Sequence, residues 1–242
     1  MKRQRIHWLS EDDPPDSFPA LDQALDEPNG LLAAGGDLSP ARLLHAYRAG
    51  IFPWFESGQP ILWWSPDPRC VIRPAEFHVS RSLRRSARRA TFQVSFNHSF
   101  PAVVEACSVR RNGQVGTWIT SDMKTAYTRL HESGWTHSVE TWCDQRLVGG
   151  IYGLASGPFF FGESMFSRQA DASKVAMLAL CHTLAANGFE FLDCQVPSQH
   201  LMTLGASVIP RSEFARRLSE LGADWNPADA WPEGRIDAAE FL

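Results

Sequence analysis

One pattern restricts the fold of this chain more than any other: a run of strands leads into a long apolar helix, which leads into a further strand. The helix is expected from about Ala172 to Ala186, where Asn187 and Gly188 end it. A strand on each side of such a helix forms a crossover, which normally makes the two strands parallel. Short polar turns join the earlier strands into an antiparallel meander, so the sheet is mixed. The strands are expected at about 137–143, 147–155 and 158–162 before the helix, and at 189–196 after it.

A meander that feeds one crossover helix resembles the N-acetyltransferase superfamily. We therefore predict an α/β (α+β) fold with an acetyltransferase-like mixed sheet and helices packed on it. In that superfamily the turn before the long helix is rich in glycine, because backbone N–H groups must close around a pyrophosphate. Here the turn from Ser167 to Ser173 has no glycine, and Asp171 would repel a phosphate. Acetyl-CoA is therefore disfavoured, and no cofactor is expected.

The first third of the chain is different, because it is dense in turn-forming residues and aromatic rings. One helix is clear within it: Ser39 can cap it, Pro40 suits its first turn and Gly50 can end it. After Pro68, strands and helices alternate. We predict a small loop-rich N-terminal domain at 1–67 and an acetyltransferase-like domain at 68–242. In the second domain, further strands are expected at 70–73 and 92–96, and helices at 102–110 and 121–133.

Five arginines lie at intervals of three, one, three and one on another expected helix, which Ser80 can cap, and so share one helix face. Removing these five positive charges from the net charge of -4 leaves -9, so this basic face is local. Such a face is typical of phosphate binding. The alternative is a solvated face paired with acids, although only Glu76 is acidic between Pro68 and Val104. We name these residues the arginine ridge: Arg81, Arg84, Arg85, Arg88 and Arg89.

Composition excludes several classes of protein. The chain has 242 residues with 44% hydrophobic content, enough for a sizeable core, but it has no apolar run of about 18 residues. Its start lacks the apolar segment of a secretory signal, so a cytoplasmic location is expected. The five cysteines are odd in number and widely spaced, which favours neither a disulfide framework nor a zinc site. No metal is expected, and Cys194 has little support as a nucleophile because no basic residue lies near it in the sequence.

The chain resembles the bacterial leucyl/phenylalanyl-tRNA–protein transferases in a series of motifs. The resemblance implies an enzyme that moves Leu or Phe from aminoacyl-tRNA to the N-terminal amine of proteins beginning with Arg or Lys, which marks them for N-end rule degradation. It also implies an acetyltransferase-like catalytic domain behind a small N-terminal domain. The matching motifs begin at Asn29, Gly35, Gly50, Trp63, Gly116, Gly162 and Leu192, and read NGLLA, GGDLSP, GIFPW, WWSPDPR, GTWI, GESMFS and LDCQ.

Three polar residues are candidates for the chemistry. Asp193 and Gln195 share one face of their strand by the two-residue period, so Asp193 can polarise Gln195, which would orient the amine. The relay proposed for the family falls on the same two positions; the alternative is two ordinary polar residues at a strand end. Glu163 follows an aromatic run, where a buried carboxylate is costly unless a cation visits it. The acceptor's Arg or Lys would be that cation, and the alternative partner is Arg168.

The resemblance also assigns the donor site. It places the terminal adenosine near Trp54, Trp118 and Tyr127, where a ring can stack on the base, and the acceptor stem on the arginine ridge. The chain has Leu180 and Leu184 where the family more often has Phe, so a wider pocket is expected and the Leu or Phe preference stays open. The pocket for the donor side chain is implied to comprise Ile151, Phe160, Met177, Leu180, Leu184 and Leu192.

Two further functions are compatible with parts of the sequence. The first is an RNA-binding module without catalysis, in which Glu163 and Asp193 are structural. The second is a carbohydrate-binding protein or glycosidase with Trp63 and Trp64 as sugar platforms and the two carboxylates as its acid pair. The glycosidase leaves the arginine ridge unexplained.

Overall fold

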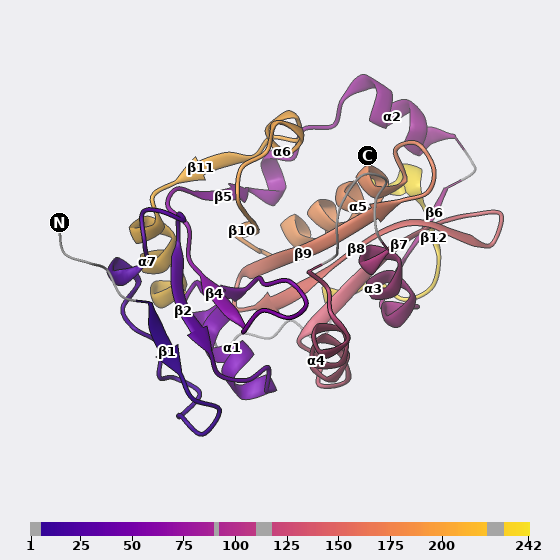
Figure 1. The fold of residues 1–242 in the computed structure, drawn as a ribbon. Coiled ribbons are helices and arrows are strands. Elements are labelled where there is room, and N and C mark those ends of the chain that lie inside the picture. The colour runs from indigo at the N-terminus through magenta and orange to yellow at the C-terminus, as the bar shows by residue number, and fades with distance from the viewer. Residues whose placement is uncertain (1–5, 90–91, 110–117, 222–229) are drawn as a thin grey trace.

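The computed structural model describes residues 6–89, 92–109, 118–221 and 230–242. In this part of the chain the strands form two sheets (Figure 1). The larger sheet has the order β11-β5-β10-β9-β8-β7-β6-β12, and the smaller one has the order β1-β2-β4-β3. The predicted mixed sheet with packed helices, preceded by a smaller N-terminal unit, is confirmed.

The centre of the larger sheet is the meander expected from the sequence. Strands β7 (Thr136–Cys143), β8 (Arg146–Ser156) and β9 (Phe159–Ser167) pair antiparallel. Helix α5 (Ala172–Ala186) then crosses to β10 (Phe191–Gln195), which pairs parallel with β9. A Cβ on Gly149 of β8 would lie 2.6 Å from Ala172, so the start of α5 depends on this glycine for its close approach to the sheet.

The sheet continues on both sides of this centre. Strand β5 (Arg69–Ile72) pairs antiparallel with β10, and β11 (Ser207–Ile209) pairs with β5. On the other side, β6 (Gln93–Phe96) pairs with β7, and β12 (Ile236–Asp237) pairs with β6. The remaining helices are α2 (Arg81–Arg88), α3 (Phe100–Ser108), α4 (Ser121–Glu132), α6 (Gln199–Thr203) and α7 (Arg211–Leu221).

Alternation along β9 divides the core into two layers. Phe159 and Phe161 face the layer that holds α3 and α4, whereas Phe160 faces the layer that holds α5 and α2. The β8–β9 pairing shifts register at Glu163, so alternation alone does not place its side chain. Its carboxylate accepts from Tyr47 of α1 (Pro40–Arg48) and from Tyr127 of α4, and therefore lies toward these two helices.

The N-terminal unit contains more regular structure than its loop-rich sequence indicated. Besides the predicted helix α1 (Pro40–Arg48), which Ser39 caps by accepting from the Arg42 N–H, it has a small sheet. The strands were not foreseen because each has only two to five residues. They are β1 (His7–Leu9), β2 (Leu31–Gly35), β3 (Phe52–Pro53) and β4 (Leu62–Trp64).

The chain passes from the smaller sheet to the larger one between Trp64 and Arg69, beside the predicted domain boundary. One apolar cluster nevertheless runs through both parts, because Tyr47 and Trp63 pack in the same core as Tyr127 and Tyr152. The division into domains at 1–67 and 68–242 therefore stays a prediction.

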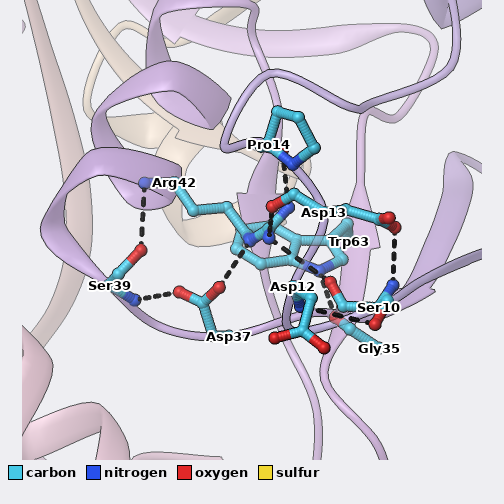
Figure 2. A network of polar contacts seen from close by, with 9 residues as sticks. All are labelled: Ser10, Asp12, Asp13, Pro14, Gly35, Asp37, Ser39, Arg42 and Trp63. Atoms are coloured by element: carbon cyan, nitrogen blue, oxygen red, sulfur yellow. Dashed lines mark hydrogen bonds and ion pairs between the residues drawn. The ribbon is translucent and has the colours of Figure 1, made fainter.

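Arg42 holds the N-terminal segment against α1 (Figure 2). Its side chain is only 1% exposed, and its Nη2 donates to the carbonyl oxygen of Asp13 at 2.7 Å. Nη1 donates to the carbonyl oxygen of Pro14, and Nε forms an ion pair with Asp37 at 3.0 Å. Nη2 also donates to the carbonyl oxygen of Ser10, and a buried guanidinium bonded to four residues fixes the relative positions of their segments.

The C-terminal residues complete the second core layer. Trp231 stacks on His137 with ring centroids 4.2 Å apart, and Phe241 is buried against Phe96. Within the described ranges no helix has the length and apolar character needed to cross a membrane. The first two residues of the motif Gly116–Ile119 lie outside the described residues, as do residues 222–229 of the tail.

Candidate active site

Glu163 is held by two tyrosines from separate helices. Tyr47 of α1 donates to Oε1 at 2.5 Å, Tyr127 of α4 donates to Oε2 at 2.8 Å, and the two hydroxyls also contact each other. Burial raises the pKa of Glu163 to about 7, although the tyrosine hydrogen bonds lower it and Asp193 raises it. The carboxyl group therefore titrates near neutral pH, and a cation bound beside it would favour the ionised form.

Asp193 has a different partner from the one expected. Its two oxygens accept from Nε and Nη2 of Arg69 at 2.8 and 2.7 Å, and both side chains are fully buried. The Gln195 backbone N–H also donates to Asp193 Oδ1, at 3.0 Å. The bond that joins Asp193 to Gln195 thus runs to the main chain of Gln195 and not to its amide group, which differs from the relay inferred from strand period. The reason is a bulge between the two residues in the β10–β5 ladder, which interrupts simple alternation.

Gln195 lies in the left-handed region, with φ of 57°. Its side-chain Nε2 donates to the carbonyl oxygen of Gly162 at 3.0 Å. A carbonyl oxygen only accepts hydrogen bonds, so this contact fixes which end of the amide is nitrogen. The amide oxygen of Gln195 therefore faces away from Gly162 and can accept a hydrogen bond.

An apolar pocket opens beside these polar groups. Three of the six residues expected in it line its wall: Ile151, Met177 and Leu192. Glu163 and Gln195, which were predicted for the chemistry, also line it. The other wall residues were not foreseen: Gly162, Ser164, Met165, Cys194 and Leu201.

The remaining three expected pocket residues are core residues in the structure. Phe160 lies over Gly153, where a Cβ would meet its ring at 2.4 Å. Leu180 and Leu184 lie about one and two turns beyond Met177 on α5, and both are completely buried. These three side chains pack in the second core layer and do not line the pocket. Periodicity placed them on the correct face of their elements but cannot tell a pocket wall from core packing.

A second groove shares Glu163, Cys194 and Gln195 with the apolar pocket. Trp54, which is 48% exposed, and Trp118 line it, so both indoles are available for stacking. Tyr127 differs from the expectation, because it is fully buried and its ring packs edge-on against Tyr152. It acts on this site through Glu163 and offers no open face to a base.

The arginine ridge is exposed along α2. Ser80 caps the helix as predicted, and Leu83 and Ala87 bury the opposite side. All five ridge arginines are exposed, and none takes part in an ion pair with another described residue. The alternative, in which acidic side chains pair with the ridge, has no such pair among the described residues. Binding of tRNA phosphate by the ridge stays a prediction.

Arg168 does not pair with Glu163, and Cys194 is poorly suited to nucleophilic attack. Arg168 donates to the carbonyl oxygen of Leu147 and lies over the Phe166 ring, while Glu163 bonds the two tyrosines instead. The Cys70 contact and burial raise the pKa of the Cys194 thiol, which disfavours a nucleophilic thiolate.

Sequence reasoning missed Tyr47 and Arg69. Tyr47 lies within the helix predicted after Ser39, where it is one of the buried residues and carries no signal of its own. Arg69 ends the motif Trp63–Arg69, and a charged residue directly before an apolar strand was the one signal that could have drawn attention to it.

Comparison with known proteins identifies the family of this chain. A family model described as leucyl/phenylalanyl-tRNA protein transferase matches residues 71–219, and the model of its N-terminal domain matches residues 36–67. Relatives named leucyl/phenylalanyl-tRNA–protein transferase include one from Pseudomonas aeruginosa strain UCBPP-PA14, 58% identical over 232 residues, covering 96% of this chain and 99% of the relative. One from Stutzerimonas stutzeri is 55% identical, and the match covers 91% of this chain and 99% of the relative. One from Nitrosospira multiformis is 53% identical, and the match covers 93% of this chain and 96% of the relative. The chain therefore belongs to the leucyl/phenylalanyl-tRNA protein transferase family.

Proposed function

We propose that this protein transfers Leu or Phe from aminoacyl-tRNA to the N-terminal amine of proteins that begin with Arg or Lys. The observation that carries the proposal is the position of Glu163 and Gln195, which line both the apolar pocket and the tryptophan groove. An ester that joins an apolar side chain to a terminal adenosine would span these two spaces. Its carbonyl carbon would then lie beside the two polar side chains.

The donor would be bound in three places. Its Leu or Phe side chain enters the pocket of Ile151, Met177 and Leu192, where burial of apolar surface supplies the free energy of binding. Its terminal base stacks on Trp54 or Trp118. Its acceptor stem places phosphates on the arginine ridge, an electrostatic contact that depends on salt.

The acceptor would be recognised by charge. The carboxylate of Glu163 attracts the guanidinium or ammonium group of the acceptor's first side chain. The amide oxygen of Gln195 accepts a hydrogen bond from the acceptor's α-amine, which orients its lone pair toward the ester carbonyl. Because an α-amine has an ordinary pKa of about 7.7–8.0, part of it is already neutral at pH 7.

The reaction balances without a cofactor, since the aminoacyl-tRNA ester is itself the activated co-substrate. The amine nitrogen forms a bond to the ester carbonyl carbon, and the bond from that carbon to the ribose oxygen breaks. The amine loses one proton, and the departing ribose oxygen gains one. We place the protein in the cytoplasm, where aminoacyl-tRNA is made, and the transferred residue would mark its acceptor for N-end rule degradation.

One assay tests the proposal. Labelled Leu-tRNA, Phe-tRNA and a non-cognate aminoacyl-tRNA are each incubated with the full chain and a peptide that begins with Arg. Label should appear on the peptide from the first two donors, and a peptide of the same sequence with an acetylated N-terminus should receive none. Binding of tRNA without any transfer would instead support an RNA-binding module.

A further inference from the structure

Arg69 of β5 occupies a fully enclosed position beside the candidate active site. Its guanidinium donates twice to Asp193, and its Nη1 donates to the carbonyl oxygen of Gly50 at 2.9 Å. The rings of Phe52 and Phe214 cover it, with centroids 5.0 and 4.6 Å from Cζ. Removal of either partner of such a buried bidentate pair leaves an uncompensated charge, so Arg69 and Asp193 act as one unit.

Asp193 is occupied by this arrangement. Oδ1 accepts from Arg69 Nε and from the Gln195 backbone N–H, and Oδ2 accepts from Arg69 Nη2. Its contact with Gln195 runs to the main-chain N–H, whereas the Gln195 amide group bonds the carbonyl oxygen of Gly162. The effect of Asp193 on Gln195 is therefore to hold the main chain.

The backbone of Gln195 depends on this hydrogen bond to Asp193 for its conformation. A left-handed conformation is unfavourable for a residue with a Cβ, because the Cβ comes too close to the following carbonyl oxygen. The bond from its N–H to Asp193 offsets that strain, and the bond from its Nε2 to Gly162 orients the amide. Without the first contact the backbone can relax, and the side chain of Gln195 would lose its position in the wall of both spaces.

The third hydrogen-bonding nitrogen of Arg69, Nη1, contacts the segment that lines the tryptophan groove. Gly50 precedes β3, and Phe52 of β3 pairs with Trp64 while Trp54 follows directly. Phe52, Pro53 and Trp54 all line the tryptophan groove. One guanidinium thus connects the strand that carries Gln195 to the segment that carries a base-stacking indole.

We propose that Arg69 is a positioning residue for aminoacyl transfer. Through Asp193 it holds Gln195 toward the acceptor amine, and through Gly50 it holds the segment of Trp54 in place relative to Gln195. The proposal rests on the proposed function. It predicts that the guanidinium fork matters, not the positive charge alone, because an ammonium group cannot bond both carboxylate oxygens and the Gly50 carbonyl in this planar arrangement.

The test compares Arg69→Lys with the double variant Arg69→Met/Asp193→Asn, which removes both charges and leaves neither unpaired. In transfer of labelled Leu to an Arg peptide, kcat of each should fall about 10- to 100-fold through misplacement of the reacting groups. The KM for Leu-tRNA should change much less, since its apolar pocket and the ridge remain. The matched control is Arg73→Met, an arginine four residues further on that also lies over a phenylalanine ring and is 40% exposed; its kcat should equal that of the wild type.

Thermal unfolding shows which variants are folded. A wild-type kcat in folded Arg69→Lys or in the folded double variant would overturn the proposal. Failure of the wild-type chain to transfer Leu or Phe would instead reject the proposed function, so the two failures are distinguishable.

The pH profile supplies a readout that a purely structural role would not change. Arg69 lowers the pKa of Glu163 and Asp193 raises it. In folded Arg69→Met, the fall of the transfer rate at acidic pH should therefore begin at a higher pH than in the wild type. In Arg69→Lys, which keeps the positive charge, this acid limb of the pH profile should stay in place. An unmoved limb in folded Arg69→Met would count against the electrostatic coupling. The groups that face Glu163 are Tyr47, Tyr127, Tyr152, Asp193 and Arg69.

Discussion

The hydroxyl of Tyr47 donates a hydrogen bond to Glu163 Oε1 at 2.5 Å, although 116 residues separate the two in the chain. Tyr47 belongs to the N-terminal unit and Glu163 to the central meander. The contact makes the N-terminal unit part of the site, because it helps to set the protonation of the carboxyl group that would meet the acceptor.

The first prediction concerns these hydroxyls. Each tyrosine bond lowers the pKa of Glu163, so Tyr47→Phe or Tyr127→Phe should raise that pKa above its value of about 7. Ionised Glu163 is needed to bind the acceptor cation, so transfer should fall more at neutral than at alkaline pH. The measurement is kcat/KM for the Arg peptide across pH. Tyr152→Phe is the control, because the Tyr152 hydroxyl is buried without a hydrogen-bond partner among the described residues; a uniform fall at every pH in Tyr47→Phe would contradict the prediction.

A second prediction concerns Gly162 and donor choice. A Cβ at this position would lie 3.3 Å from Leu192 Cδ1 and 4.0 Å from Ile151 Cδ1, inside the pocket wall. Gly162→Ala should therefore narrow the pocket and reduce transfer of Phe relative to Leu by about 10-fold, the size of a one-carbon effect in an apolar site. Competition between Phe-tRNA and Leu-tRNA measures the ratio. Ile151→Val removes one carbon and should shift the ratio in the opposite direction; the same direction in both variants would refute the assignment of this wall.

The third prediction concerns the arginine ridge. Replacement of Arg84 and Arg88 by Ala should weaken tRNA binding and reduce the slope of log K against log salt by about 1–2. The control is Arg216→Ala, an exposed arginine on α7 that is paired with Glu220. An unchanged slope in the double variant would exclude phosphate contacts by these two residues.

The fourth prediction concerns Arg42, which lines neither the apolar pocket nor the tryptophan groove. Arg42→Met removes the donors that hold the carbonyl groups of Asp13 and Pro14 and leaves Asp37 without its ion pair. The free energy of unfolding should fall by about 3 kcal/mol, measured by urea titration. Arg146→Met, at an exposed position on β8, should change it by less than about 0.5 kcal/mol. A loss confined to kcat, with stability intact, would show that Arg42 acts on the site and not on the fold.

The order of helices and strands from β5 to β10 was predicted by the sequence itself, whereas α6, β11, α7 and β12, which follow, were not. The apolar run 172–186 with its Asn-Gly end predicts α5, and the polar turns around it predict the meander, because periodicity and capping are local properties. The same local information placed the arginine ridge on an exposed helix face. It also placed Glu163 and Gln195 among the candidates through the family motifs.

Only the tertiary structure decided which of these residues meet. Tyr47, Tyr127 and Glu163 come from α1, α4 and β9, and Arg69 reaches Asp193 across 124 residues. Leu180 and Leu184 share a helix face with Met177, yet only Met177 lines the pocket. The physical reason is that hydrophobic periodicity records which face of an element is buried, whereas the partner across that face depends on how the layers pack. A buried ion pair and a left-handed Gln195 are consequences of that packing and leave no periodic signal in the chain.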